Sequence, residues 1–177
     1  MTRIPFRFAA ALALVSTSQL QAAGPAPVKP CMTQPELRAM VAYVMPSAMA
    51  TLIGHCKPAL PAGASLLSHG AQLVITFEGS RAANFPLARQ AFAKFSETGD
   101  KNNTAIILAL PEAVLRPIID ETVTKELTGS IKVQDCTNID RVFATLEPLP
   151  ASNLIDLVTQ VMTITARDDK QMSVCAS

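Results

Sequence analysis

The sequence predicts an all-α fold, a compact bundle of five or six helices stapled by two disulfides. Three observations lead to this prediction. Aromatic residues make up only 5% of the chain, with no Trp and one Tyr, so the core must be largely aliphatic, which favours helix over sheet. Apolar residues recur at helical spacing behind recognisable helix starts. Four cysteines provide the partners for two bridges.

Residues 1–23 have the pattern of a cleavable secretory signal peptide. Arg3 and Arg7 make its start basic, residues 8–15 are apolar and uncharged, and small residues follow from Ala22. Its apolar core is about half the roughly 20 residues that a membrane-spanning helix needs. We therefore expect cleavage at the end of this segment and export to the periplasm or the extracellular space.

The chain beyond the signal peptide is expected to be one domain behind a short lead-in. Residues 24–32 are Pro-rich and extended, and residues 33–177 contain neither a repeat nor a long linker. Removing Arg3 and Arg7 lowers the count of Lys and Arg from 15 to 13, against 14 Asp and Glu. A nearly neutral domain has no basic face for nucleic acid. No transmembrane anchor is expected after signal cleavage.

The first helix has the clearest signature. Thr33 and Glu36 have the spacing of a capping box, in which each side chain accepts a hydrogen bond from the other residue's backbone N–H. Apolar residues then follow one helical face through residues 37–53, and Gly54 is expected to end the helix. Pro46 lies inside this stretch and lacks the N–H that bonds the preceding turn. We expect one helix kinked at Pro46.

The middle of the chain is harder to assign. Residues 64–79 favour a helix, although residues 72–78 also fit a strand, and the same ambiguity holds for residues 105–110. Asn84 is expected to cap a further helix. The polar run 96–104 is expected to be an exposed loop. The helix behind Asn84 is expected to bury four side chains: Leu87, Ala91, Phe92 and Phe95.

Three further helices are predicted in the last third of the chain. One begins at Pro111 and ends near Gly129, and Ser152 is expected to cap the last helix. Thr137 and Asp140 have capping-box spacing at the start of a short helix between these two. The inward residues expected from the apolar spacing are Leu115, Ile118, Ile119, Leu127, Val142, Phe143, Leu146, Leu154, Leu157, Val158 and Val161.

The first helix restricts how Cys31, Cys56, Cys136 and Cys175 can pair. About 20 helical residues separate the first two by about 30 Å, whereas a disulfide needs Cα atoms within about 7 Å. Two pairings remain: Cys31–Cys175 with Cys56–Cys136, or Cys31–Cys136 with Cys56–Cys175. The first, nested pairing is preferred because it holds both the Pro-rich lead-in and the polar tail.

No metal or cofactor site is predicted. His55, His69 and Asp135 lie near cysteines or near one another in sequence, but they match no zinc-binding spacing, and disulfides would occupy the thiolates. Thioethers can bind Cu(I) in oxidising compartments. Met40, Met45 and Met49 nevertheless alternate with aliphatic residues on the buried stripe of the first helix, where Met is an ordinary core residue.

No catalytic residue is predicted either. Ser65, Ser68 and His69 supply a hydroxyl and an imidazole, but no GxSxG motif surrounds them, and neighbouring residues on a helix are expected to point apart. A pair of carboxylates could support glycoside chemistry. The available ones, Asp120, Glu121 and Glu126, are expected to face solvent on a regular helix.

Binding is the class of function that the sequence favours. Arg81, Asn84, Phe85 and Arg89 gather around an expected helix start, where an anion could bind, but a capped helix with solvated arginines is the preferred explanation. A helical exported domain could also hold an apolar ligand between its helices or bind a protein partner. The expected role is a binding or structural module; the alternative is a hydrolase whose site is assembled from dispersed residues.

Overall fold

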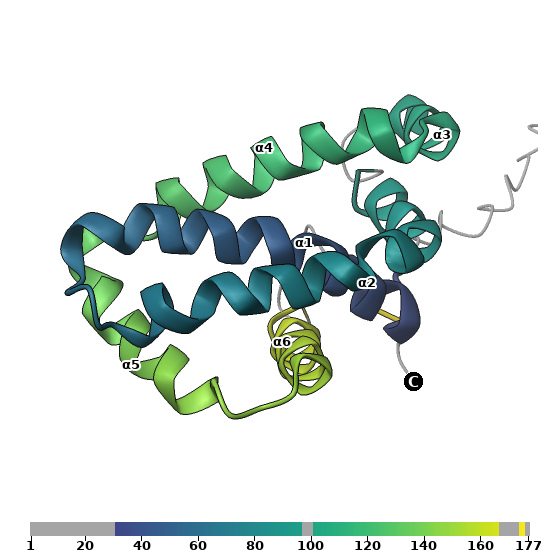
Figure 1. The fold of residues 1–177 in the computed structure, drawn as a ribbon. Helices are drawn as coiled ribbons and strands as arrows, with labels where there is room; N and C mark the ends of the chain where they lie inside the picture. Colours follow the sequence, from purple (N-terminus) through teal and green to yellow (C-terminus); the bar gives the residue numbers. More distant parts are fainter. Residues whose placement is uncertain (1–30, 97–100, 167–173, 176–177) are drawn as a thin grey trace, which may run out of the picture.

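A computed structural model of the chain describes residues 31–96, 101–166 and 174–175 (Figure 1). Within these ranges the fold is all-α: the chain forms six α-helices and two 3-10 turns, and the sole β interaction is an isolated parallel bridge between Met32 and Val174. The predicted helical bundle is confirmed. The predicted signal peptide, residues 1–23, and most of the lead-in lie outside the described residues.

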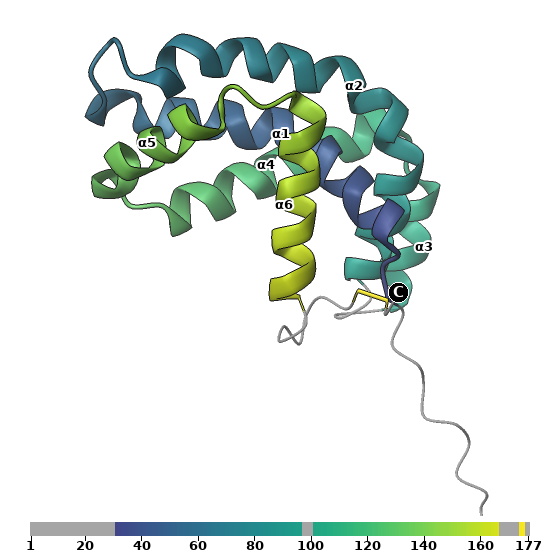
Figure 2. The ribbon, with the colours of Figure 1, turned by 90° about the horizontal axis from the view of Figure 1, so that it is seen from below.

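Helix α1, Gln34–Cys56, begins with the predicted capping box. The Glu36 backbone N–H donates to Thr33 Oγ1 at 3.4 Å, and the Thr33 N–H donates to Glu36 Oε2 at 2.7 Å. The helix continues through Gly54, where we expected it to end. Pro46 lies inside the helix, and Figure 2 shows that the axis of α1 changes direction along its length.

Helix α1 is the central element of the bundle. Helix α2, Ser65–Ser96, runs antiparallel beside it, α4 lies along its other side, and α6 crosses both α1 and α2 (Figures 1 and 2). Helices α1 and α2 approach each other closely at Gly70. A Cβ atom added at Gly70 would lie 2.8 Å from Cδ1 of Ile53 on α1. A glycine at this position lets the two helices approach closely.

The stretch Gln34–Ala59 consists of α1 and the 3-10 turn Lys57–Ala59. Judged by length and composition alone, it could cross a membrane, and among the described residues no other helix is both long and apolar enough to do so. We expected no membrane-spanning segment after the signal peptide. In the bundle, α1 has other helices packed along it, and its first turn holds the buried carboxylate of Glu36. These are the surroundings of a core helix.

Helix α2 is one continuous helix, so the prediction of a second helix capped by Asn84 is wrong. Residues 72–78 are helical, which decides the ambiguity between helix and strand. The Asn84 side chain donates to the Ser80 carbonyl at 2.8 Å instead of capping a helix start. Pro86 lies inside the helix, and α2 turns downward at its C-terminal end in Figure 2.

Helix α3, Lys101–Ala109, corrects one expectation and decides one ambiguity. The polar run 96–104 is not a loop throughout, because α2 includes Ser96 and α3 begins at Lys101. Residues 105–109 are helical, so this apolar run is not a strand. Five successive residues, from Ala105 to Ala109, are apolar, and a helix cannot bury all of them against one neighbour.

The last third of the chain contains α4, Glu112–Ser130, the 3-10 turn Val133–Asp135, α5, Cys136–Leu146, and α6, Ala151–Thr165. Asp140 does not close a capping box. Its Oδ1 accepts the backbone N–H of Leu66 at 2.8 Å and so satisfies a donor at the start of α2. Ser152 does not cap α6, since its Oγ donates to Asn153 Oδ1 and Pro150 precedes the helix.

Several apolar residues that we expected to be buried are exposed. Leu115, Ile119, Phe143 and Leu154 are buried as predicted. The exposed ones are Leu87, Phe95, Ile118, Val142, Leu157 and Val161. Six helices of this length do not surround each other completely, so the outer edges of the predicted apolar faces remain uncovered.

The two disulfides are Cys31–Cys175 and Cys56–Cys136, the preferred nested pairing, with Cα separations of 5.0 and 5.4 Å. Cys56 and Cys136 are fully buried, and their bridge ties the end of α1 to the start of α5. The other bridge joins the two ends of the domain, where the Cys175 N–H also donates to the Met32 carbonyl at 2.9 Å. Disulfides of this kind are typical of oxidising compartments.

Candidate functional site

An apolar groove lies between the C-terminal part of α2, α3 and α4. We call it the α3 groove. Its volume is about 500 Å³. Two polar side chains line it together with nine apolar ones, and the full set is Phe92, Phe95, Ser96, Ile106, Ile107, Leu110, Leu115, Ile118, Ile119, Thr122 and Val123. Such a size and lining are typical of sites for small apolar ligands.

The groove exists because α3 and α4 bury only one side of their apolar residues. Leu115 and Ile119 are buried against Tyr43 and its neighbours on α1, and this contact holds α4 against the bundle. Ile106 and Ile118 point to the other side and are more than half exposed. The apolar surface that these residues leave uncovered lines the groove.

The hydroxyl groups of both polar side chains in the groove already donate a hydrogen bond to the backbone. Ser96 Oγ donates to the Ala93 carbonyl at 2.8 Å, and Thr122 Oγ1 donates to the Ile118 carbonyl at 2.8 Å. Each hydroxyl therefore retains only acceptor capacity. The described lining contains no charged side chain. An anionic group placed in this groove would lose its hydration without gaining a donor.

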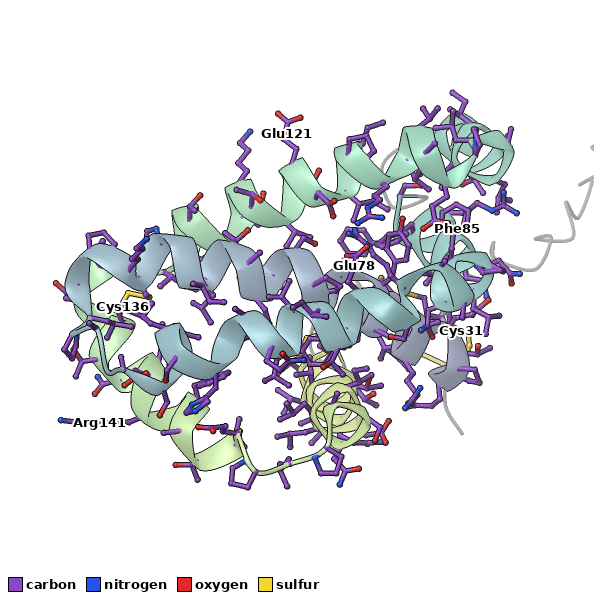
Figure 3. All side chains as sticks on the ribbon, in the orientation of Figure 1. Cys31, Glu78, Phe85, Glu121, Cys136 and Arg141 are labelled. Carbon is purple, nitrogen blue, oxygen red and sulfur yellow. A yellow bond between two sulfur atoms is a disulfide. The ribbon has the colours of Figure 1, made fainter. Side chains whose placement is uncertain are left out.

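An ion cluster around the buried Arg81 attaches α4 to α2. The Arg81 guanidinium pairs with both carboxylate oxygens of Asp120, and Arg116 pairs with Glu78. Arg81 also lies over the Tyr43 ring, 4.5 Å from its centroid. Figure 3 labels Glu78 in this region and shows Glu121, the neighbour of Asp120, pointing away from the bundle.

The cluster shifts the pKa values of its buried members. Burial alone would lower the pKa of Arg81, but the hydrogen bond and the negative charge of Asp120 outweigh it, and the net pKa is raised. Burial raises the pKa of the Tyr43 hydroxyl to about 12; the positive charge of Arg81 opposes this shift and the carboxylate of Glu112 adds to it. Arg81 is charged and Tyr43 is neutral throughout the ordinary pH range.

A second buried ion pair joins the start of α1 to the end of α2. Lys94 Nζ lies 2.7 Å from both carboxylate oxygens of Glu36. Burial alone would raise the pKa of Glu36, but the hydrogen bonds from Lys94 and Thr33 outweigh it and lower the pKa. This pair attaches the end of α2 to α1, and the Arg81 cluster attaches the middle of α2 to α4.

The structure brings Ser68 and His69 together, which our sequence analysis did not expect. Ser68 Oγ lies 3.2 Å from His69 Nδ1, and Glu147 Oε1 lies 3.1 Å from the same nitrogen. A catalytic serine and an orienting acid must contact different ring nitrogens. Ser68 Oγ also donates to the Ala64 carbonyl. This arrangement is therefore not a hydrolytic triad. Ser65 contributes its backbone carbonyl, which accepts a hydrogen bond from Ser68 Oγ.

The other predicted candidates have structural contacts. His55 Nε2 lies 3.0 Å from the Ile131 carbonyl, and no group of three or more His, Cys, Asp or Glu side chains gathers among the described residues. Arg81 is part of the ion cluster and Arg89 lies over the ring of Phe85, so these arginines are not the solvated side chains that we expected, nor do they form an anion site with Asn84. Met40 and Met49 are buried in the core, with Met45 packed against it.

The three carboxylates considered for glycoside chemistry do not form a pair in a cleft. Asp120 is an ion-pair partner of Arg81, whereas Glu121 and Glu126 are exposed.

Comparisons with protein-family models, with curated proteins and with solved structures found no significant match to this chain. The class of protein is therefore defined by fold and site alone: a helical, disulfide-bonded domain with an open apolar groove.

Proposed function

We propose that this protein is an exported binding protein that holds a small, uncharged apolar ligand in the α3 groove. The observation that carries the proposal is the groove itself, about 500 Å³ in volume and lined almost entirely by aliphatic and aromatic side chains. Ligand sites in proteins are commonly concave, largely apolar and of this size. Burying this surface under an apolar ligand would be favourable by the hydrophobic effect.

The ligand is proposed to be uncharged because the groove offers nothing to balance a charge. Its two hydroxyl groups donate to helix carbonyls, and no described lining residue is ionisable. Three basic side chains of α2 and α4 pair with carboxylates: Arg81 and Arg116 are in the ion cluster, and Lys94 is paired with Glu36. A neutral ligand avoids the large cost of burying an unpaired charge.

Export is supported by two independent features. The basic, apolar and small-residue order of residues 1–23 is that of a signal peptide, and the two disulfides suit an oxidising compartment. We propose a periplasmic or extracellular location. The intact mass of the protein purified from its own host should correspond to a chain that lacks about the first 23 residues. A full-length mass would contradict export through this segment.

Ligand binding is tested by titrating the protein with N-phenyl-1-naphthylamine, an uncharged apolar dye whose fluorescence rises in apolar surroundings. The variant Ile118→Glu places a carboxylate in the groove, where burial under the dye would leave the charge without a partner. We expect Ile118→Glu to weaken dye binding about tenfold, the effect of roughly 1–2 kcal/mol for an unpaired polar group.

Ile75→Glu is the matched control. Ile118 and Ile75 are both exposed helix residues, 53% and 65% accessible, and Ile75 lies outside the α3 groove. Ile75→Glu should therefore leave the dye affinity unchanged. Equal affinities of both variants and the unmodified protein would contradict the proposed function, as would the absence of dye binding.

A further inference from the structure

The polar atoms along the α3 groove are hydrogen-bond acceptors. The hydroxyls of Ser96 and Thr122 donate to helix carbonyls, as described above. The N–H groups of Leu110 and Leu115, at the end of α3 and the start of α4, donate to the Ile106 and Pro111 carbonyls at 3.1 Å. The other described lining residues lie further inside their helices, where each N–H bonds the preceding turn. The described lining therefore has no free donor.

The end of α3 adds a further acceptor. In a continuing helix, the Ile107 carbonyl would accept the N–H of the residue four positions later, but that residue is Pro111, which has no N–H. The Leu110 N–H donates to the Ile106 carbonyl. The Ile107 carbonyl therefore has no donor of its own in the last turn of α3, and Ile107 lines the groove.

Thr122 carries the hydroxyl that a ligand in the groove can reach. The residue is exposed, and its Oγ1 bonds the Ile118 carbonyl, one turn earlier on α4. Ile118 and Thr122 both line the groove, so this hydroxyl lies on the face of α4 that borders it. The hydrogen bond of the Ser96 hydroxyl is partly buried. A hydroxyl that has donated its proton still accepts through its lone pairs.

We propose that the ligand of the α3 groove is an apolar alcohol, whose O–H donates to Thr122 Oγ1. This assignment rests on the proposed function and narrows its class of ligand. A hydroxyl on the ligand can exchange its bond to water for a bond to Thr122. A ketone, ether or ester of the same shape can only accept, so it would lose its bond to water and find no donor in the described lining, which is unfavourable.

The test compares menthol with menthone, which have the same carbon skeleton and carry a hydroxyl and a ketone at the same carbon. The methyl signals of Ile118 and Ile119, which line the groove, report binding in NMR titrations. We expect both ligands to shift these signals, because both are apolar and uncharged. Menthol should bind about fivefold more tightly, the effect of one net hydrogen bond between neutral groups.

The variant Thr122→Val keeps the shape of the side chain and removes its hydroxyl. It should lower the affinity for menthol about fivefold, to that for menthone, and leave the affinity for menthone unchanged. Thr128→Val is the matched control on the same helix. Thr128 Oγ1 also donates to the carbonyl four residues earlier, at 2.8 Å from Thr124 O, but Thr128 lies outside the groove. Its replacement should change neither affinity.

The outcomes separate the choice of an alcohol from the existence of the apolar site. Equal affinities for menthol and menthone, with Ile118 and Ile119 shifting, would overturn the alcohol and leave the proposed function in place. A preference for menthol that persists in Thr122→Val would overturn the role of Thr122 as its acceptor. If neither ligand shifted these two signals, both the alcohol and the proposed function would be contradicted.

Discussion

Replacing Asp120 with alanine should destabilise the fold by about 3 kcal/mol, although Asp120 is a surface residue. Its side chain is 32% exposed, but its partner Arg81 is only 3% exposed. The substitution would leave the Arg81 charge buried with Glu78 as its remaining carboxylate, 3.5 Å away. Breaking a buried ion pair from one side costs about 3–5 kcal/mol because the remaining charge stays desolvated.

The free energy of unfolding from urea titrations measures this effect. Glu121→Ala, at the next position on the solvent side of α4, is the matched control and should change stability by less than about 0.5 kcal/mol. The double variant Asp120→Ala with Arg81→Met removes the buried charge as well, and it should recover most of the loss. If Asp120→Ala were no more destabilising than Glu121→Ala, the buried cluster would not hold α4 to α2.

Removing the buried disulfide should have a still larger effect. Replacing Cys56 and Cys136 together with alanine opens a loop whose ends are 80 residues apart in sequence. In the chain-entropy model, closing a loop of this length stabilises a fold by about 4–5 kcal/mol. The total stability of a domain is about 5–15 kcal/mol, so we expect this variant to be close to unfolding at 37 °C.

Replacing Cys31 and Cys175 together with alanine is the comparison for this experiment. These cysteines are partly exposed, whereas Cys56 and Cys136 are fully buried and their loss also removes core contacts. Urea midpoints should therefore fall further without Cys56–Cys136 than without Cys31–Cys175. The opposite order would contradict the view that the buried bridge holds α1 and α5 together.

Local signals in the sequence predicted local structure at one helix start and failed at others. The capping box of Thr33 and Glu36 forms as expected, because both hydrogen bonds join residues three positions apart. The same spacing at Thr137 and Asp140 led to a wrong prediction, since Asp140 instead accepts the backbone N–H of Leu66 in the first turn of α2, 74 residues before it. A carboxylate that can satisfy a distant helix end is indistinguishable, in sequence, from one that caps its own helix.

The α3 groove could not be predicted from helical periodicity. The spacing of Phe95, Ile118 and Leu157 is that of buried residues, but all three side chains are exposed. Periodicity identifies which face of a helix is apolar, but it does not show how much of that face a neighbour will cover. The Arg81 cluster was missed for a related reason: its partners lie on different helices, 39 residues apart for Arg81 and Asp120.

The most direct test of the central claim is NMR of isoleucine methyl groups during titration with N-phenyl-1-naphthylamine. Four isoleucines line the α3 groove: Ile106, Ile107, Ile118 and Ile119. The account predicts that these four signals shift together as the dye binds, while Ile75 and Ile164 do not shift. Dye binding that shifts other isoleucines and leaves these four unchanged would contradict an apolar ligand site in the α3 groove.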